Sequence, residues 1–276
     1  MPPHIELMIP GATVSGTPLE VTAPYNNALL ATVDTADAVA VEQALATAHA
    51  LFRDRSQWLS KSQRISILSR TAELMSGQRD ALALAAAAEG GKPLIDSRVE
   101  VDRAIDGLHN CVECIRTAAG REIPMDINAA SADRLAMTQH EPIGVVAAVS
   151  AFNHPVNLIV HQVGPAIAAG CPVIIKPAED TPLSCFRFVE LLREAGLPEA
   201  WCQPLVVSEP EVATQLVTDE RIGFFSFIGS ARVGWMLRSQ LAPGALCALE
   251  HGGAAPVIVA ADADLEQALP LLAKGG

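Results

Sequence analysis

The chain has 276 residues, half of them hydrophobic, so it can bury a large core and is not disordered. Its formal net charge of −12 leaves no basic stripe to displace the counterions of a nucleic acid, which excludes nucleic acid as an expected partner. We find no signal peptide and no apolar run long enough for a membrane span, so we expect a cytoplasmic protein without membrane partners.

Six cysteines are scattered along the chain, too few for a disulfide scaffold. Cys111 and Cys114 have the spacing of a metal-binding or redox pair. No second pair with such spacing and no directly adjacent histidine accompanies them, so a buried helix face is the favoured interpretation. We therefore expect reduced, mostly buried thiols and no metal site.

The chain begins with short apolar runs and then becomes helical. In residues 11–33 these runs are broken by Gly, Pro and Asn, which predicts strands with a turn at residues 24–27. An alanine-rich helix is expected over residues 36–52, and either Asp34 or Thr35 could cap it.

Two further helical blocks follow. Residues 61–88 predict one long helix or a helix pair that ends at the glycines of residues 90–91. Residues 93–119 predict another helix, which Gly120 stops. All of these helices are amphipathic, so we interpret them as packing elements.

Residues 121–140 change to a polar, loosely alternating pattern, which favours a β-hairpin. A hairpin that projects from a helical body is a typical contact between subunits, so we expect it to join copies of the chain.

From residue 144 onward, short β-branched runs alternate with helical stretches. Four such repeats with short crossovers predict an α/β fold with a parallel, doubly wound sheet. The expected strands are residues 145–149, 173–175, 205–207 and 222–227, followed in turn by a helix after Pro155 and by helices at residues 181–195, 209–217 and 231–241. Thr181 with Pro182 predicts the start of the second of these helices, and Ala195 with Gly196 predicts its end.

Ligands of such sheets bind beyond the carboxyl ends of the strands, so function is expected in the segments that follow them. One of these segments passes through Gly229 and Ser230 into a helix, which can present backbone N–H groups to a pyrophosphate or can be a simple structural cap. Another places Lys176 and Glu179 three residues apart, where they can bind the hydroxyls of a ribose or form a surface ion pair.

The other two segments carry one candidate catalytic side chain each. The amide of Asn153 could donate to a developing oxyanion, although Asn is also a common turn residue. Glu250 follows an apolar strand, so desolvation could raise its proton affinity and make it a general base; the alternative is a glutamate turned to solvent.

In this order and spacing, the four segments resemble the aldehyde dehydrogenase superfamily. The resemblance runs essentially from end to end and includes Gly91-Lys-Pro-Leu94, Gly164-Pro-Ala-Ile-Ala-Ala-Gly170 and the glycines at 252 and 253. It implies a Rossmann-like sheet over residues 141–255 that binds NAD, preceded by residues 1–120 of the same domain. It also implies that residues 121–140 form an oligomerisation hairpin in a homodimer or homotetramer.

The resemblance also implies roles for individual residues. Asn153 would hold the oxyanion, and Glu250 would activate the water that hydrolyses a thioester. The cofactor would be bound by the cleft residues Ser150, Ala151 and Phe152, by Lys176 and Glu179 at the ribose, by Gly229 and Ser230 at the pyrophosphate, and by Val233 at the adenine. Glu179 would repel a 2′-phosphate, so NAD is expected over NADP.

Three departures from the family accompany the resemblance. His251 stands where the family usually has Leu, and no glycine-rich turn follows Val207. The nucleophilic cysteine of the family is expected beyond Gly276, so residues 256–276 would be the start of a catalytic domain.

The favoured interpretation is an enzyme that oxidises an aldehyde to a carboxylic acid with NAD, through a cysteine thioester. A non-catalytic NAD-binding fragment is the alternative, and an acyl-transferring relative is disfavoured because it needs no water-activating Glu250. The stretches Phe152-Asn-His-Pro155 and His161-Gln162 resemble those of family branches that act on small polar or anionic aldehydes, which implies a substrate of that kind. From the residues alone, His161 is more readily interpreted as a packed helix residue.

Overall fold

The computed structural model describes residues 2–13, 16–207 and 209–275, and a five-stranded parallel sheet lies at its centre. The strand order is β10-β9-β6-β7-β8, so the chain starts in the middle of the sheet and adds strands on both sides. This arrangement confirms the predicted doubly wound sheet. The strands are β6 (Val145–Val149), β7 (Val173–Lys176), β8 (Cys202–Pro204), β9 (Ile222–Gly229) and β10 (Leu246–His251).

Helices cover both faces of this sheet, because successive strand residues point to opposite sides. Val146 and Ala148 of β6 pack in a core with α5 (Asn157–Ala169) and α6 (Leu183–Glu194). The alternate residues Val145 and Ala147 pack in a second core on the other face. That core is completed by α1 (Ala38–Arg53), α7 (Pro210–Thr218) and α8 (Ala231–Arg238).

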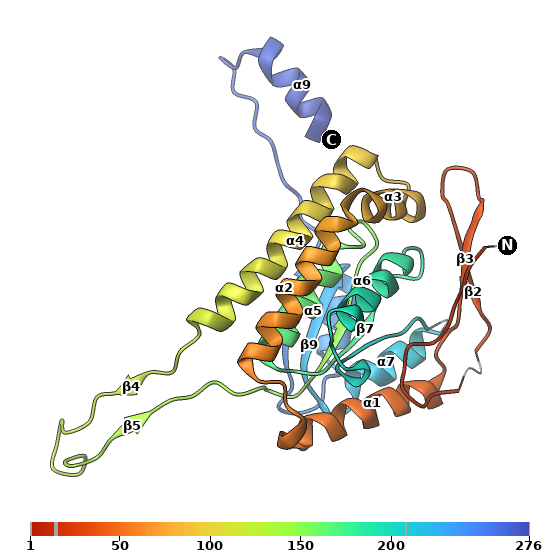
Figure 1. Cartoon of the computed structure of the whole chain (residues 1–276). Coiled ribbons are helices and arrows are strands. Elements are labelled where there is room, and N and C mark those ends of the chain that lie inside the picture. The colour runs from red at the N-terminus through yellow and green to blue at the C-terminus, as the bar shows by residue number, and fades with distance from the viewer. Residues whose placement is uncertain (1, 14–15, 208, 276) are drawn as a thin grey trace.

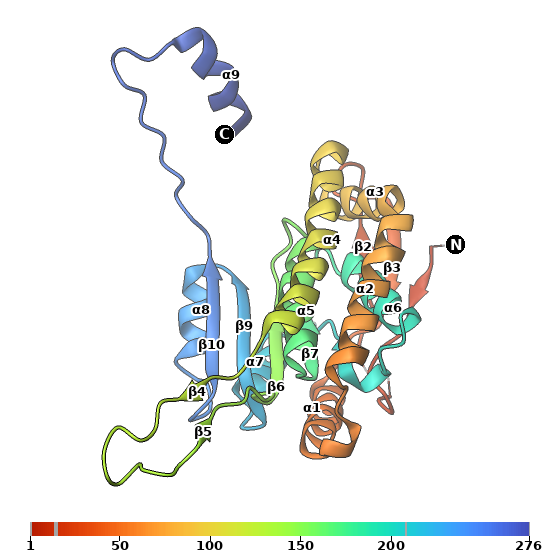
Figure 2. The same cartoon turned by 60° about the vertical axis from the view of Figure 1, so that its left-hand side comes forward.

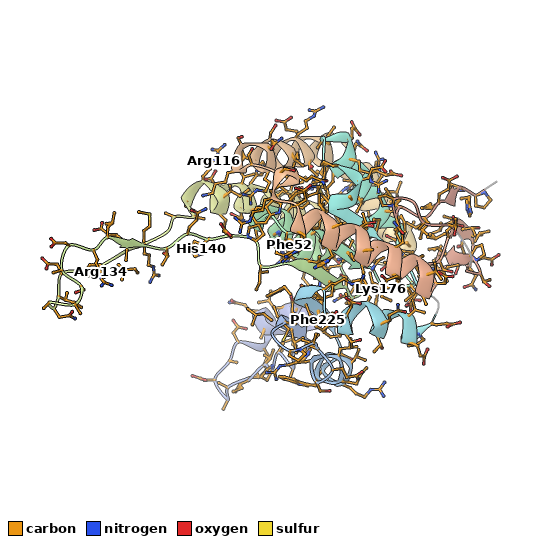
Figure 3. The ribbon with its side chains drawn as sticks, turned by 90° about the horizontal axis from the view of Figure 1, so that it is seen from below. Phe52, Arg116, Arg134, His140, Lys176 and Phe225 are labelled. Carbon is orange, nitrogen blue, oxygen red and sulfur yellow. The ribbon has the colours of Figure 1, made fainter. Side chains whose placement is uncertain are left out.

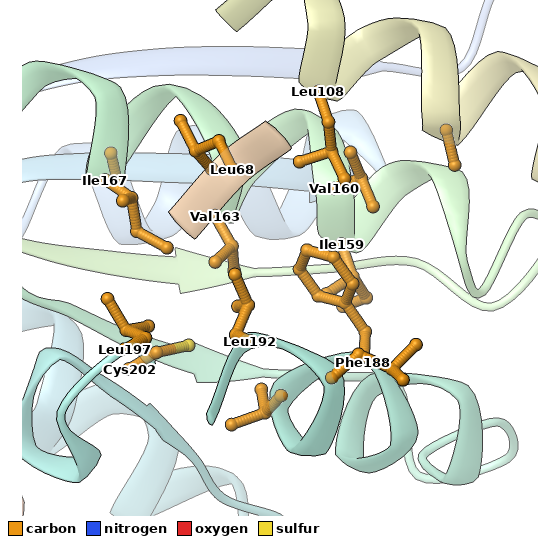
Figure 4. Close-up of a cluster of buried hydrophobic side chains, with 14 of the residues drawn as sticks. Leu68, Leu108, Ile159, Val160, Val163, Ile167, Phe188, Leu192, Leu197 and Cys202 are labelled. Carbon is orange, nitrogen blue, oxygen red and sulfur yellow. The ribbon is translucent and has the colours of Figure 1, made fainter. Parts of the chain in front are cut away.

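A further layer of helices lies outside α5 and α6 (Figure 1). It consists of α2 (Lys61–Gly77), α3 (Arg79–Gly90) and α4 (Leu94–Thr117), so the block at residues 61–88 is a helix pair. Gly91 ends the pair with a φ of 65°, a left-handed conformation that favours glycine. Leu68 of α2, Leu108 of α4 and Val160 of α5 meet in one buried cluster, which Figure 4 shows.

A small sheet forms at the N-terminus from β1 (His4–Ile5), β2 (Leu19–Thr22) and β3 (Leu29–Val33). Strands β2 and β3 are antiparallel and are joined through the predicted turn. The short strand β1 was not predicted; it pairs with β3 in parallel.

Two segments leave the body of the molecule. Strands β4 (Glu122–Ile123) and β5 (Ala136–Met137) form the predicted hairpin, which projects from the body of the molecule (Figures 1 and 2). Arg134 and His140 lie along it in Figure 3. After β10 the chain runs away from the sheet to α9 (Leu265–Gly275), in which no residue is buried.

The predicted cap of the first helix was wrong. Asp37 caps α1 by accepting a hydrogen bond from the Ala40 N–H at 2.8 Å. Asp34 instead accepts from the Leu7 N–H at 3.3 Å, and Thr35 donates to the carbonyl of Thr17 at 2.9 Å. Contacts with the N-terminal segment therefore occupy both of the side chains expected to cap this helix.

The predicted third strand was displaced. Residues 205–207 were expected, whereas β8 comprises Cys202–Pro204 and pairs with β7. The prediction followed the apolar run, but the strand contains a buried polar residue, Gln203, whose side chain donates to the carbonyl of Ala44 at 3.1 Å. Ser208, at the turn where the glycines are missing, lies outside the described residues.

Thr181 does not cap α6. The helix begins at Leu183 with no cap from a nearby side chain, and the Thr181 hydroxyl donates to the carbonyl of Phe152 at 3.4 Å. The carboxylate of Glu89, on α3, accepts instead from the N–H groups of Leu183 at 2.8 Å and Ser184 at 2.9 Å. The predicted end was correct, because Gly196 follows the helix with a φ of 98°.

Among the residues that the structure describes, no helix combines the length and the apolar character needed to cross a membrane.

Candidate active site

A cavity of about 540 Å³ lies at the carboxyl edge of the sheet, between β9, β10 and the helices α4 and α5. Asn153 and Glu250 both line it, although 97 positions separate them in sequence. The cavity also brings together four of the residues predicted to bind the cofactor, namely Ala151, Phe152, Gly229 and Ser230. The two candidate catalytic side chains therefore open onto one space, as the sequence predicted.

Strand register explains why these segments meet. Val149 pairs with Phe227 on one side and with Lys176 on the other, and Ile228 pairs with Glu250. The ends of β6, β7, β9 and β10 are thus level, and the loops after them leave the same edge of the sheet.

The loop that carries Asn153 is held by Glu100, a residue of α4. One oxygen of its carboxylate, Oε1, accepts from the N–H groups of Val156 at 2.8 Å and Asn157 at 3.0 Å, which caps the start of α5. The Glu100 side chain is completely buried. Its second oxygen, Oε2, accepts from the Lys92 ammonium at 2.7 Å.

Lys92 connects the same carboxylate to the loop. Its Nζ donates to the carbonyl of Asn153 at 3.3 Å and lies 2.6 Å from Nδ1 of His154. Burial and then the positive charge of Lys92 lower the pKa of His154, with Arg103 acting in the same direction and Glu100 opposing it. His154 therefore lines the cavity as a neutral imidazole at neutral pH.

Arg103 adds a positive charge to the cavity wall from α4. No ion pair or hydrogen bond to its guanidinium is found among the described residues. Arg103, Glu100 and Lys92 were not predicted as site residues, although Lys92 lies in the Gly91–Leu94 motif. Nothing in the local pattern distinguishes Arg103 from any other arginine on the polar side of an amphipathic helix.

Glu250 is more exposed than expected. It lies on β10, an edge strand whose alternate residues Leu246, Ala248 and Glu250 are exposed. The Glu250 carboxylate was expected to be desolvated, and this expectation is wrong. Among the described residues, no element covers this side of β10. His161 was also misjudged: it is exposed and lines the cavity instead of packing into the core.

The remaining predicted cofactor residues lie outside this cavity. Lys176 is buried, and its Nζ donates to Oε1 of the half-exposed Glu179 at 2.6 Å. The backbone N–H of Ser150 donates to the carbonyl of Lys176 at 3.0 Å, while the buried Ser150 hydroxyl has no hydrogen-bond partner in the described chain. Val233 packs against the core beneath α8.

Comparison with known proteins identifies the family. Residues 12–276 match the model of the aldehyde dehydrogenase family. The chain belongs to this family. Its relatives include the 3-sulfolactaldehyde dehydrogenase of Priestia aryabhattai, which is 35% identical over 93% of this chain and 53% of its own length.

Solved aldehyde dehydrogenase structures share the fold. The NAD-dependent aldehyde dehydrogenase of Sinorhizobium meliloti superposes with a TM-score of 0.89 at 30% identity, over 99% of this chain and 55% of that one. The glyceraldehyde-3-phosphate dehydrogenase of Methanocaldococcus jannaschii complexed with NADP gives 0.85 at 30% identity, over 93% and 56%. The chain therefore spans about half the length of the aldehyde dehydrogenases that it matches.

His251, the departure next to Glu250, is accommodated by packing. Its ring lies edge-on to Phe227 at 6.0 Å and to Trp235 at 5.4 Å between centroids. A Cβ on Gly234 would collide with the imidazole, so the glycine leaves room for it. His251 therefore belongs to an aromatic cluster with Phe227 and Trp235.

Most of the cysteines of this aldehyde dehydrogenase chain are poor nucleophiles. Cys111, Cys171, Cys185 and Cys202 are buried free thiols. Burial raises the pKa of Cys111 to about 11 and of Cys202 to about 12, and raises those of the other two as well. The thiolate needed for attack on a carbonyl is thus disfavoured at all four. Cys114 is exposed, so only one member of the 111/114 pair belongs to the buried helix face.

Proposed function

We propose that the whole protein containing this chain oxidises a small aldehyde to a carboxylic acid with NAD. The observation that carries the proposal is the shared cavity of Asn153 and Glu250. An amide donor and a carboxylate base in one cavity are the two groups that thioester chemistry needs beside its nucleophile. The thiol would come from residues outside these 276, a proposal supported by the chain's spanning about half the length of the relatives that it matches.

Each of the two side chains has a separate step to support. The Asn153 amide would donate to the oxygen of the aldehyde as that oxygen becomes negative during attack by the thiol. Glu250 would take a proton from water, and the water oxygen would then attack the thioester carbon and release the acid. The remainder of the protein would have to cover β10 for Glu250 to become desolvated.

The strand ends suit an adenine dinucleotide. Donors and acceptors for a ribose come from the buried ammonium of Lys176 and the half-exposed carboxylate of Glu179. The buried hydroxyl of Ser150 adds another, since it has no hydrogen-bond partner among the described residues. Gly229 and Ser230, at the start of α8, would receive the pyrophosphate, and Val233 would pack near the adenine. NAD, when bound, supplies the hydride acceptor.

Glu179 supports NAD as the preferred cofactor. Its carboxylate would repel the 2′-phosphate of NADP. Related structures include both an NAD-dependent enzyme and an NADP complex, so the preference is part of the proposal.

The cavity wall favours an aldehyde that carries an acid group. Arg103 provides a positive charge without an ion-pair partner among the described residues, and His154 and His161 add polar contacts. A related enzyme acts on 3-sulfolactaldehyde. We include small anionic aldehydes in the proposal as the expected substrates.

The hairpin suits a subunit contact. Ile127, Leu135 and Met137 are exposed on a segment that projects from the body, and burying them between subunits would be favourable. We propose a homodimer or homotetramer. We also propose a cytoplasmic location, supported by six free cysteines, four of them buried.

The test uses the whole protein and its Glu250→Gln variant, with a panel of anionic and neutral aldehydes and with NAD and NADP. We expect a burst of NADH from the variant, followed by slow turnover, because the thioester forms but is not hydrolysed. A variant with the steady-state rate of the wild type and no accumulated acyl-enzyme would remove Glu250 from the mechanism. A wild-type protein that binds NAD but oxidises no aldehyde would favour the non-catalytic alternative.

A further inference from the structure

The loop carrying Asn153 is attached to the outer helical layer by a buried ion pair. Lys92 lies between α3 and α4 in the Gly91–Leu94 motif, and Glu100 lies on α4. Only 14% of the Lys92 side chain and none of the Glu100 side chain is exposed. A buried pair of charges costs desolvation energy, so its presence beside Asn153 calls for an explanation beyond stability.

We propose that Lys92 and Glu100 are positioning residues, which hold the backbone on both sides of Pro155 so that the amide of Asn153 stays aimed at the aldehyde oxygen. The inference rests on the proposed aldehyde oxidation and adds two residues to it. Neither side chain lines the cavity, so both act through Asn153.

The hydrogen bonds of the pair are complete. The three donors of the Lys92 ammonium match its three neighbours: Glu100 Oε2 at 2.7 Å, the Asn153 carbonyl at 3.3 Å and His154 Nδ1 at 2.6 Å. Oε1 of Glu100 accepts the N–H groups of the two residues after Pro155. The backbone is therefore anchored at Asn153, two residues before the proline, and at the two residues after it.

The same contacts determine the tautomer of His154. Because the ammonium donates to Nδ1, the proton of the neutral ring is on Nε2. Its pKa is lowered by burial and by Lys92 and Arg103, so the ring stays neutral beside two cations. Loss of Lys92 would free the imidazole as well as the Asn153 carbonyl.

The experiment compares Lys92→Met and Lys92→Arg in the whole protein. Lys61→Met is the matched control, because Lys61 also donates to a backbone carbonyl, that of Ala118 at 3.2 Å, at the other end of α4. The readouts are the single-turnover rate of NADH formation at saturating aldehyde, the Kd for NAD and the melting temperature.

We expect Lys92→Met to slow NADH formation by about a hundredfold, the effect of misplacing a reacting group by about 1 Å, with an unchanged Kd for NAD. Lys92→Arg should recover most of the rate because it keeps the charge and the donors, and Lys61→Met should match the wild type. If Lys92→Met does not fold, Glu100→Gln replaces it, with the same expected result.

A rate for Lys92→Met equal to that of the wild type would overturn the inference. So would a parallel loss of rate, NAD binding and melting temperature, since that pattern marks a general structural role. If the wild type oxidises no aldehyde, the proposed function fails, and crystal structures of the wild type and Lys92→Met then decide the inference. A displaced Asn153 in the variant would support it, and an unmoved one would refute it.

Discussion

Helices α5 and α6 begin in the same way but with different electrostatics. Both lie on the same face of the sheet, and neither has a side-chain cap from its own N-terminus. In each case a buried glutamate of the outer helical layer accepts two backbone N–H groups, Glu100 for α5 and Glu89 for α6. A carboxylate at this position accepts from backbone N–H groups that have no partner within the helix. Its negative charge also interacts favourably with the positive end of the helix dipole.

The difference lies in the partner of each carboxylate. Glu100 has the Lys92 ammonium at 2.7 Å, whereas among the described residues Glu89 has only the backbone N–H groups and the hydroxyl of Ser184. Burial accordingly raises the pKa of Glu89 from 4.5 to about 7, against the lowering effect of those hydrogen bonds. The same capping geometry therefore serves two purposes. At Glu89 it stabilises the start of a helix, and at Glu100, with Lys92 added, it also holds the loop that carries Asn153.

The largest expected effect is on stability when Glu100 is removed. Glu100→Ala leaves the buried ammonium of Lys92 without its countercharge and exposes uncapped N–H groups, so the free energy of unfolding should fall by about 3–5 kcal/mol. Glu89→Ala leaves no unpaired ion and should cost about 1–3 kcal/mol. Urea unfolding of both variants measures the two values, and equal losses would show that Lys92 adds nothing to the cap.

The next effect is a dependence of stability on pH. Because the pKa of Glu89 is raised in the folded protein, the folded state binds the proton more tightly than the unfolded state. Protonated Glu89 therefore adds to the free energy of unfolding, and this contribution is fully present below pH 4.5. It is lost as the pH rises to about 7, and the loss is about 3 kcal/mol at most.

The measurement is the unfolding free energy of the wild type and of Glu89→Gln across this pH range. The glutamine does not titrate, so the wild type should lose stability relative to the variant as the pH rises. Parallel curves for the two proteins would contradict the assignment of this pH dependence to Glu89.

The smallest effect concerns a local cap. Asp37 caps α1 from within the same stretch of chain, by accepting from the Ala40 N–H three residues later. Asp37→Ala should lower the free energy of unfolding by about 1 kcal/mol, the usual cost of an N-cap. If the loss in urea unfolding approached that of Glu100→Ala, the distinction between local and long-range caps would be lost.

Much of the fold could be predicted because the relevant signals are local. Apolar periodicity located β6 at residues 145–149 without error, and glycine located the ends of α3 and α6. The position of β8 was predicted wrongly because of Gln203. A polar residue in a buried strand breaks the apolar pattern on which the prediction depends.

The candidate site was predicted less completely. Asn153 and Glu250 were found because they follow strands, and they do share a cavity. Glu100 was not found, since its partners lie 56 and 57 residues away and a glutamate on an amphipathic helix is expected to face solvent. The exposure of Glu250 was missed because burial depends on which elements pack over a strand.

The sequence by itself determined the alternation of strands and helices, the parallel sheet and the residues at the strand ends, because turns and periodicity are properties of neighbouring residues. Only the tertiary structure decided which distant side chains cap α5 and α6, that Lys92 reaches the Asn153 loop, and that Arg103 enters the cavity wall. These pairings follow from the packing of whole helices on the sheet, which brings together groups that no local pattern connects.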